Sequence, residues 1–293
     1  MSFELDVPDG LRTTLAGRPP AGGPSGDDWL RALPRLLAAA ADRWGLSDPQ
    51  PPRYGECALV VPCTSSSGPV ALKLTWPHPE ARFEHLALRA WNGDGAVRLL
   101  AADTTDHALL LEQLDADRSL EQIDLLEACE TVGSLLRQLD RPALPQIGSP
   151  PVDAWRALLE HGGEHVPRRF VTRAAALLRD LPTGDRLVHS DLHFANVLAG
   201  QRASWLAIDP KPVTASPAFG VAPVLWNRWS EATAAYNLRS HLRLRAGLVA
   251  ESAGIDEDDA MAWSFVRCVL NACETPPGDA ALSRWITIAK AMT

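Results

Sequence analysis

The spacing of apolar residues changes near residue 114, and this change constrains the fold more than any other feature of the sequence. Before it, short apolar runs bounded by turn residues predict strands at 58–61, 70–74, 97–101 and 108–111. After it, apolar residues recur at helical spacing over 118–140, 151–161, 167–180, 221–253, 257–273 and 279–291. Two β-like runs, 186–188 and 205–208, interrupt this half. The pattern predicts an α+β protein with a small sheet-containing lobe over 1–114 and a larger, mostly helical lobe over 115–293.

Two helices are predicted to accompany the sheet of the first lobe. Asp27 or Asp28 can cap a helix that ends near Trp44, and Pro34 is expected to kink it. A second helix is predicted over 79–91, directly after the second strand. The sheet therefore has amphipathic helices to pack against.

Composition narrows the class of partner. Hydrophobic residues make up 46% of the chain and charged residues 22%, as in a globular protein, and the net charge is −8. This acidic balance argues against nucleic acid or an anionic membrane surface as the partner, and it is compatible with a cationic small molecule. No apolar run approaches the roughly 18 residues that a membrane span needs, and the first ten residues lack the regions of a signal peptide.

The cysteines indicate a reducing compartment. There are 5 of them, an odd number, and no two form a CxxC pair. This argues against a disulfide framework or a zinc site, so we interpret them as reduced thiols. We expect a cytoplasmic protein that is a monomer or a homodimer.

The segment 187–209, LVHSDLHFANVLAGQRASWLAID, holds the residues most typical of catalysis. Asp191 is followed five positions on by Asn196, and Asp209 closes the next β-like run. In phosphoryl transfer a carboxylate such as Asp191 orients an attacking hydroxyl and accepts its proton, while Asn196 and Asp209 offer hard oxygen ligands for Mg²⁺. His189 can hold the loop through a backbone hydrogen bond. The alternative is a polar turn between two strands, since Asp and Asn are common turn residues.

A lysine and a glutamate upstream strengthen the catalytic interpretation. Lys73 lies in a predicted strand, like the lysine that contacts nucleotide phosphates in protein-kinase-like enzymes. Glu84 lies in the following helix, where an ion-pair partner for that lysine is needed. Each residue alone is typical of a solvent-exposed charge. Their order, followed by a hinge, HxDxxxxN and a final Asp, is what favours a kinase-like site.

Five blocks of sequence are similar to those of a known family. They are VALK at 70–73, ALRAWNGDGAVRLLAAD at 87–103, LLLEQL at 109–114, HSDLHFANVL at 189–198 and WLAIDPK at 205–211. With them the chain resembles the aminoglycoside phosphotransferases and, more closely, the streptomycin 6-phosphotransferase and hydroxyurea phosphotransferase family. The resemblance extends from about residue 30 to the C-terminus.

The resemblance implies a two-lobed protein-kinase-like fold, with ATP and Mg²⁺ as cofactors. It implies transfer of the γ-phosphate to a hydroxyl of a small molecule, either an aminoglycoside-type antibiotic such as streptomycin or hydroxyurea. By position, the implied site residues are the base Asp191, the Mg²⁺ ligands Asn196 and Asp209, the phosphate clamp Lys73 with Glu84, and the hinge Glu112, Gln113 and Leu114, whose backbone faces adenine.

Several positions depart from the family pattern. Ser190 stands where members usually have Gly, and Ser216 and Gly220 stand where members commonly carry acids. Loss of these acids leaves the rigidity of the loop, the substrate and the level of activity open. The chain also lacks a GxGxxG nucleotide loop. Ser65, Ser66 and Ser67 lie in the hairpin 63–69, where they can either contact phosphates or form a solvated tip.

Two other functions stay open. A kinase-like protein that acts on a non-antibiotic metabolite, or binds nucleotide with little turnover, fits the loss of the two acids. A metal-dependent hydrolase can use histidines four residues apart, which here are His189 with His193 and His161 with His165. The absence of an HExxH glutamate and the glycines at 162–163 argue against the hydrolase.

The acceptor is expected to bind the helical lobe. Glu231 and Glu274 are candidates to hold a cationic group, and Trp226 is a candidate to line the pocket. The alternatives are solvent-exposed carboxylates and helix packing. The acidic run 256–259 is more typical of a helix N-terminus than of a binding site.

Overall fold

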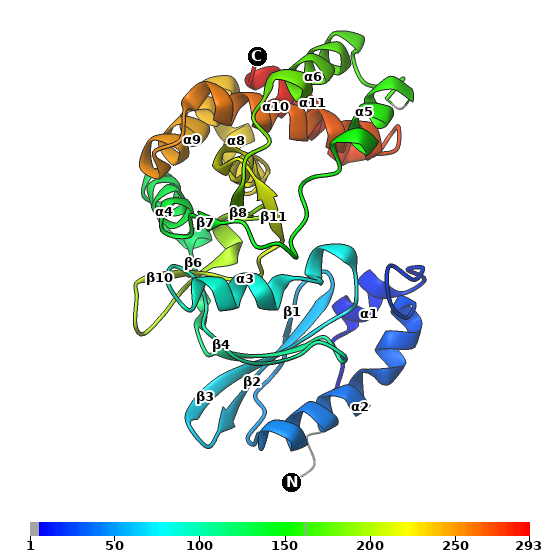
Figure 1. Cartoon of the computed structure of the whole chain (residues 1–293), viewed down its shortest axis with the longest axis vertical. Coiled ribbons are helices and arrows are strands. Elements are labelled where there is room, and N and C mark those ends of the chain that lie inside the picture. The colour runs from blue at the N-terminus through cyan, green and yellow to red at the C-terminus, as the bar shows by residue number, and fades with distance from the viewer. Residues whose placement is uncertain (1–5, 162) are drawn as a thin grey trace. The chain divides into compact units, whose positions relative to one another are not determined.

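A computed structural model describes residues 6–161 and 163–293. Residues 1–5, at the start of the segment searched for a signal peptide, and Gly162, one of the two glycines after His161, lie outside the described residues. The chain divides into two compact units. The first runs to Asp115 and includes Gly200–Ser204, and the second holds Ala116–Ala199 and Trp205–Thr293 (Figure 1). The change in sequence pattern near residue 114 lies close to the end of the first unit. It gave no sign that Gly200–Ser204 also belongs to that unit.

The first unit is built on a five-stranded antiparallel sheet with the order β1-β2-β3-β5-β4. Its strands are β1 (Arg53–Tyr54), β2 (Ala58–Ser65), β3 (Gly68–Thr75), β4 (Leu99–Asp103) and β5 (Ala108–Glu112). The four predicted strands are confirmed, although β4 begins at Leu99 rather than at residue 97. The β2–β3 hairpin turns at Gly68, whose φ of +114° is a conformation that favours glycine.

The two faces of this sheet are covered by different helices. Along β3, Val70, Leu72 and Leu74 join a buried core with α1 (Asp9–Leu15) and α2 (Gly26–Trp44). Because side chains alternate along a strand, Lys73 points to the other face, toward α3 (Glu84–Trp91). Figure 1 shows α2 and α3 on opposite sides of the sheet. The alternation therefore places one charged side chain of β3 against α3.

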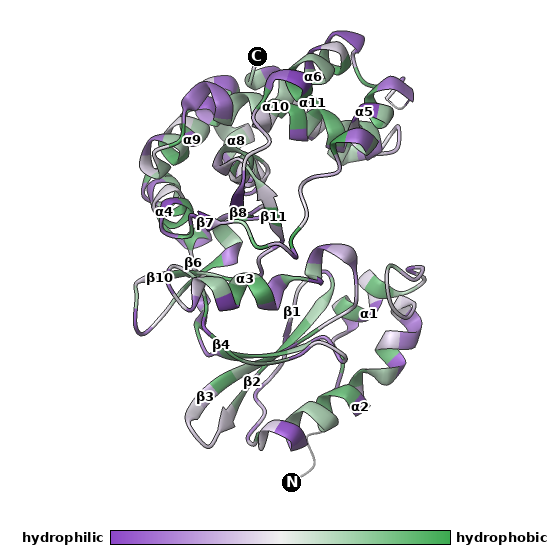
Figure 2. Ribbon diagram, viewed as in Figure 1, coloured by the Kyte–Doolittle hydropathy of each residue, from purple (hydrophilic) through white to green (hydrophobic). Residues whose placement is uncertain are grey.

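The start of α2 differs from the expectation. Ser25, rather than Asp27 or Asp28, caps the helix, because its hydroxyl accepts a hydrogen bond from the Asp28 N–H at 3.1 Å. The helix continues through Pro34 as one element. In Figure 2, polar and apolar residues alternate along α2, whereas β2 and β3 are mostly apolar, as expected for a helix with one face on a sheet.

The second unit contains two three-stranded sheets, with the orders β10-β9-β6 and β11-β8-β7. The strands are β6 (Asp115–Ser119), β7 (Arg141–Pro142), β8 (Arg186–His189), β9 (Val197–Ala199), β10 (Trp205–Ala207) and β11 (Pro212–Ala215). Both predicted β-like runs are confirmed, as β8 and β10. Pro212 pairs with His189, and Ala207 pairs with Val197. This register brings the loop 190–196 beside the loop 208–211.

Helices make up most of the second unit. They are α4 (Leu125–Gln138), α5 (Val152–His161), α6 (Arg168–Asp180), α7 (Pro223–Trp226), α8 (Trp229–Ala234), α9 (Leu238–Ala253), α10 (Glu257–Glu274) and α11 (Ala280–Ala291). The helix predicted from residue 118 begins only at Leu125, where Asp124 caps it. The helix predicted over 221–253 is three helices, because Arg228 has a φ of +50° and Asn237 caps a new start at α9.

Two expectations from composition can be compared with the structure. Within the described residues, no helix is long and apolar enough to cross a membrane. All five cysteines lie in the described part of the chain and none is in a disulfide; all are buried except Cys57, which is partly exposed.

Candidate active site

The loop between β8 and β9 brings Asp191 and Asn196 together. Asn196 Nδ2 donates to the Asp191 carbonyl oxygen at 2.9 Å, and the His193 N–H donates to the same oxygen at 3.1 Å. The Asn196 N–H in turn donates to the His193 carbonyl at 2.9 Å, in a 3₁₀ turn over Phe194–Asn196. The loop is therefore closed around one carbonyl, which fixes the backbone that carries the Asp191 carboxylate.

His189 holds this loop from the end of β8. Its Nε2 bonds to the Ile208 carbonyl at 3.0 Å, and its Nδ1 accepts the Asp191 N–H at 3.2 Å. These two bonds require a neutral imidazole with the proton on Nε2. Burial lowers the pKa of His189 to about 4, which keeps the ring neutral. The expected structural role of His189 is confirmed.

Asp209 lies next to a residue that is bonded to the same loop. The Ile208 N–H donates to the Asn196 carbonyl at 2.9 Å. Asp209 itself has a φ of +53°, a left-handed backbone that is uncommon for a residue other than glycine and that clusters at functional sites. The sequence therefore folds Asn196 and Asp209 onto neighbouring loops.

Asn196 and Asp209 have the donor chemistry that Mg²⁺ prefers. The Asn196 amide nitrogen is bonded to Asp191, so its amide oxygen is directed away from that bond. An amide oxygen and a carboxylate, completed by water and phosphate oxygens, form a common ligand set for this ion. The two residues therefore fit Mg²⁺.

Lys211 is a residue of the site that sequence reasoning missed. Its Nζ lies 2.9 Å from Asp191 Oδ2. Its carbonyl accepts hydrogen bonds from the Ser190 N–H at 3.1 Å and the Ser190 hydroxyl at 2.7 Å. The β8–β11 register explains this arrangement, since pairing of Pro212 with His189 places Lys211 opposite Ser190. The serine that replaces the usual glycine thus has a partner for its hydroxyl.

Arg267 of α10 supports the same loop from the helical side. Its Nη1 donates to the carbonyls of Ser190 and Phe219, each at 2.9 Å. Its guanidinium carbon lies 4.3 Å from the centroid of the Phe219 ring. The one signal in the sequence is that Arg267 is the only charged residue between positions 260 and 273.

The histidine pairs make hydrogen bonds to the backbone. Both ring nitrogens of His189 are used in hydrogen bonds to backbone groups. In the second pair, His161 Nδ1 and His165 Nε2 bond to backbone carbonyls at 3.1 and 2.9 Å. Within the described parts of the chain, no three His, Cys, Asp or Glu side chains are grouped so that they can hold a metal ion. His189 therefore has no ring nitrogen left for a metal, and the hydrolase alternative finds no support in these residues.

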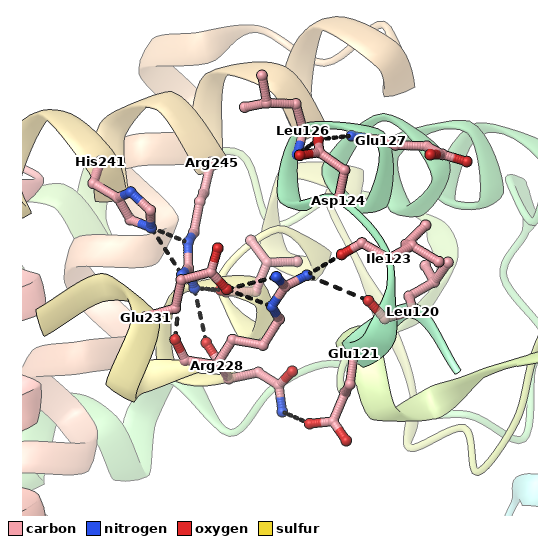
Figure 3. Close-up of polar contacts among 12 residues, drawn as sticks. Leu120, Glu121, Ile123, Asp124, Leu126, Glu127, Arg228, Glu231, His241 and Arg245 are labelled. Atoms are coloured by element: carbon pink, nitrogen blue, oxygen red, sulfur yellow. Dashed lines mark hydrogen bonds and ion pairs between the residues drawn. The ribbon is translucent and has the colours of Figure 1, made fainter. Parts of the chain in front are cut away.

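The predicted acceptor residue Glu231 lies in a hydrogen-bonded network (Figure 3). Its carboxylate pairs with Arg228 at 2.6 Å. Arg228 also donates to the carbonyls of Leu120 and Ile123, at 3.4 and 3.0 Å, and the buried Arg245 donates to the Arg228 carbonyl at 3.3 Å. Figure 3 shows these groups converging from α8, α9 and the segment before α4. Glu231 therefore anchors Arg228, and a contact with the acceptor stays a prediction.

The other two acceptor candidates lie apart from this network. The ring of the half-buried Trp226 packs edge-on against Trp285, with centroids 5.3 Å apart, and lies 5.2 Å from the Arg267 guanidinium carbon. Glu274 is exposed at the end of α10. The acidic run at the start of α10 caps the helix through Asp256, as expected. Roles for Trp226 and Glu274 in acceptor binding remain predictions.

In the first unit, Lys73 and Glu84 form a buried ion pair. Lys73 Nζ lies 2.7 and 2.8 Å from the two carboxylate oxygens of Glu84. The side chains are 5% and 4% exposed, so water screens the pair very little. The pair joins β3 to α3, and the structure brings these two predicted residues together.

The predicted hinge is shaped by Glu112 at the end of β5. Its carboxylate accepts hydrogen bonds from the Arg98 N–H at 2.7 Å and from Arg202 at 2.7 to 3.1 Å. Its own N–H donates to the Arg98 carbonyl at 3.0 Å. Gln113 and Leu114 lie outside both flanking strands. The Arg202 contact explains why Gly200–Ser204 belongs to the first unit.

The serines of the β2–β3 hairpin were the other nucleotide candidates. The Ser65 hydroxyl donates to the Gly68 carbonyl at 3.1 Å and accepts the Ser67 N–H at 3.2 Å. Ser65 thus stabilises the turn itself. A contact between this hairpin and phosphate stays a prediction.

Solved structures of small-molecule kinases share this fold. An aminoglycoside phosphotransferase solved with ADP and hygromycin B is similar at a TM-score of 0.55 and 15% identity, covering 86% of this chain and 97% of that chain. A choline/ethanolamine kinase family protein from Mesorhizobium loti is similar at a TM-score of 0.61 and 14% identity, covering 97% and 94%. At these identities the likeness concerns the fold, and it confirms the predicted α+β, protein-kinase-like class.

Sequence comparison then identifies the family within that class. The family described as aminoglycoside/hydroxyurea antibiotic resistance kinase matches residues 43–276. The streptomycin 6-kinase of Streptomyces griseus is 36% identical, covering 92% of this chain and 91% of its own. The hydroxyurea phosphotransferase of Kitasatospora aureofaciens is also 36% identical, covering 92% and 82%. The chain belongs to this family of antibiotic resistance kinases, which confirms the resemblance seen in the motifs.

Proposed function

We propose that this protein transfers the γ-phosphate of ATP to a hydroxyl group of an aminoglycoside-type antibiotic such as streptomycin, or of hydroxyurea. The observation that carries the proposal is the geometry of the loop 189–196. There the Asn196 side chain donates a hydrogen bond to the Asp191 carbonyl, and Asp209 lies on the neighbouring loop. Relatives 36% identical over 92% of the chain, a streptomycin 6-kinase and a hydroxyurea phosphotransferase, support the substrate class.

The proposed role of Asp191 is that of the base. It orients the acceptor hydroxyl and accepts its proton as the acceptor oxygen bonds to the γ-phosphorus. The bond from that phosphorus to the leaving oxygen of ADP breaks in the same step, so the products are ADP and a phosphorylated acceptor. This chemistry depends mostly on positioning. The hydrogen bond that His189 accepts from the Asp191 N–H, and those that His193 and Asn196 donate to the Asp191 carbonyl, set the loop before the substrate binds.

We assign the Mg²⁺ to Asn196 and Asp209. The ion, when bound, neutralises negative charge on the phosphates. The support for this assignment is the pair of oxygen donors on adjacent loops and the left-handed backbone of Asp209. The tight turn keeps the Asn196 amide in one orientation, because its nitrogen is tied to Asp191.

In the first unit, we assign nucleotide contacts to Lys73 and to the hinge. Lys73, held by Glu84 at 2.7 Å, would contact the α- and β-phosphates. The Glu112 N–H is already bonded to the Arg98 carbonyl, so we narrow the adenine contact to the backbone of Gln113 and Leu114. An enzyme that uses ATP and carries five free thiols fits the cytoplasm, which is the location we propose.

A second candidate function is phosphorylation of a non-antibiotic metabolite, and the residue at position 220 favours it. Gly220 stands where family members commonly carry an acid. A Cβ at this position would lie 3.1 Å from side-chain atoms of Leu136 and Val188, so an acidic residue needs these neighbours to shift. The local packing thus differs from the family pattern close to Val188 of β8, the strand that leads to the catalytic loop.

Release of ADP from Mg·ATP tests the two candidates together. The acceptors are streptomycin, other aminoglycosides, hydroxyurea and simple amino sugars, each with the wild type, with Asp191→Asn and with the matched surface variant Asp258→Asn. We expect release that requires one of the antibiotics, and a kcat lower by on the order of 10² to 10⁴ in Asp191→Asn, with Asp258→Asn unchanged. Release only with amino sugars would favour the second candidate, and full turnover by Asp191→Asn would refute the assigned base.

A further inference from the structure

The ion pair between Lys211 and Asp191 carries an inference that rests on the proposed function. Lys211 Nζ lies 2.9 Å from Asp191 Oδ2, and the two side chains keep 34% and 18% of their surface exposed. Both side chains are therefore partly buried, and water reaches the pair without surrounding it.

The backbone holds Lys211 beside the proposed base. The β8–β11 register places Lys211 opposite Ser190, and two hydrogen bonds from Ser190 to the Lys211 carbonyl lock that position. The ring of Pro210 restricts the backbone immediately before it. The Lys211 side chain thus starts from a fixed point, while its four-carbon stem lets the ammonium group move.

The choice of lysine at this position stands out in the composition. Of the 28 Lys and Arg residues in the chain, only three are lysines: Lys73, Lys211 and Lys290. Lys290 is exposed on α11, whereas the other two pair with the carboxylates of Glu84 and Asp191. The chain uses arginine for nearly all its positive charge but has lysine at both of these places.

Physical differences between the two side chains indicate why lysine is suited to this position. An arginine beside Asp191 can bind both carboxylate oxygens through its planar fork, which would occupy the atom needed to accept a proton. The Lys211 ammonium is instead a compact charge, and it contacts Asp191 at Oδ2. It can also donate to a second partner, since an ammonium group has three N–H donors.

The reaction places such a partner nearby. The acceptor oxygen must lie within hydrogen-bond distance of the base, and the γ-phosphorus must lie about 3 to 3.5 Å from that oxygen. During transfer, negative charge is spread over the three equatorial oxygens of the phosphoryl group. A cation 2.9 Å from the base is within reach of these oxygens through a small change of its side-chain torsions.

We propose that Lys211 is a catalytic residue that holds Asp191 through Oδ2 in the free enzyme and donates a hydrogen bond to the phosphoryl group as it is transferred. Lys211 stays protonated throughout. The acceptor proton goes to Asp191, the new O–P bond forms, and the bond to ADP breaks as in the proposed reaction. The role of Lys211 is electrostatic stabilisation of the transition state.

Three variants test the proposal against a purely structural ion pair. Lys211→Met removes the charge, Lys211→Arg keeps both the charge and an ion pair, and Lys290→Met is the matched surface control. For each, we would measure kcat and KM with the acceptor found for the wild type, the affinity for Mg·ADP, and the gain in that affinity when aluminium fluoride mimics the phosphoryl group in transfer.

We expect kcat to fall by on the order of 10² to 10³ in Lys211→Met, with the affinity for Mg·ADP within about twofold of the wild type. In this variant, aluminium fluoride should no longer raise the affinity for Mg·ADP. Lys211→Arg should recover less than a tenth of the lost kcat, because its fork occupies the carboxylate, and Lys290→Met should match the wild type. If Lys211→Met does not fold, the kcat of Lys211→Arg tests the proposal, because this variant keeps the charge and an ion pair.

Two results would overturn the proposal in distinguishable ways. Turnover by Lys211→Met or Lys211→Arg within threefold of the wild type, with the fluoride effect kept, refutes the role of Lys211 and leaves the proposed function intact. No turnover by the wild type with any acceptor refutes the proposed function, and the role of Lys211 with it.

Discussion

A single buried histidine shows how one side chain organises the loop that carries Asp191 and Asn196. His189 links three parts of the second unit: the end of β8, the Ile208 carbonyl before Asp209, and the backbone N–H of Asp191. Both bonds depend on the neutral ring, because Nδ1 must offer a lone pair while Nε2 carries the proton. In the proposed reaction its role is to position Asp191, and its protonation state depends on pH.

The first prediction concerns the stability of the protein in acid. Burial lowers the pKa of His189 from 6.5 to about 4 in the folded state. The unfolded state therefore binds the proton more readily, so the stabilisation is complete above pH 6.5 and is lost as pH falls toward 4. The expected loss from this residue is roughly 3 kcal/mol in the free energy of unfolding.

Urea unfolding at pH 7 and pH 4.5 measures this loss. The variants are His189→Gln and the matched control His161→Gln, whose histidine is exposed. Stability should depend less on pH in His189→Gln than in the wild type, and His161→Gln should follow the wild type. An equal pH dependence in His189→Gln and the wild type would show that His189 is not buried as a neutral base.

At the scale of elements, α3 is tied to the sheet by the ion pair between Lys73 and Glu84. The rest of the buried face of α3 is apolar, formed by Ala87, Leu88 and Trp91. A buried pair adds little net stability compared with apolar packing, but removal of one partner leaves the other charge without compensation. The pair therefore makes the position of α3 depend on both residues.

The second prediction follows from this asymmetry. Glu84→Gln should lower the free energy of unfolding by about 3 to 5 kcal/mol, and the double variant Lys73→Met with Glu84→Leu should recover much of it. Urea unfolding gives both values, with Glu130→Gln on the exposed face of α4 as the control. A Glu84→Gln protein as stable as the control would contradict the buried pair.

Individual helices and strands also show what could and could not be predicted from the sequence. Local signals predicted four strands of the first unit and two of the second. They also singled out Asp191, Asn196 and Asp209 as candidate site residues, because the three lie in one short segment. They failed at 221–253, where apolar spacing continues across Arg228 although its φ of +50° ends one helix before the next. They also missed Lys211, whose position beside Asp191 depends on the β8–β11 register, a long-range pairing.

At the scale of the whole molecule, the cysteines report on the packing of both units. Burial raises the pKa of Cys129 and Cys268 to about 12, and that of Cys63 and Cys273 to about 11. Cys57 is the partly exposed one, with the Arg18 guanidinium 3.2 Å from its sulfur. The four buried thiols are therefore both inaccessible and protonated near neutral pH.

The third prediction concerns thiol labelling of the intact chain. A maleimide at pH 7.5 should label one cysteine of the folded protein quickly, and all five in urea, as counted by intact mass. Cys57→Ser should remove the fast label. Rapid labelling of two or more thiols in the folded state would contradict the burial of the remaining four.

The central claim, phosphorylation of an antibiotic hydroxyl, is tested most directly by the mass of the acceptor. Streptomycin and hydroxyurea would each be incubated with Mg·ATP and the wild type, with Asp191→Asn or Asp258→Asn in parallel, and the small molecules analysed by mass spectrometry. We predict that one of them gains a single phosphoryl group with the wild type and Asp258→Asn, and remains unmodified with Asp191→Asn. ADP formation with both acceptors left unmodified would contradict the account.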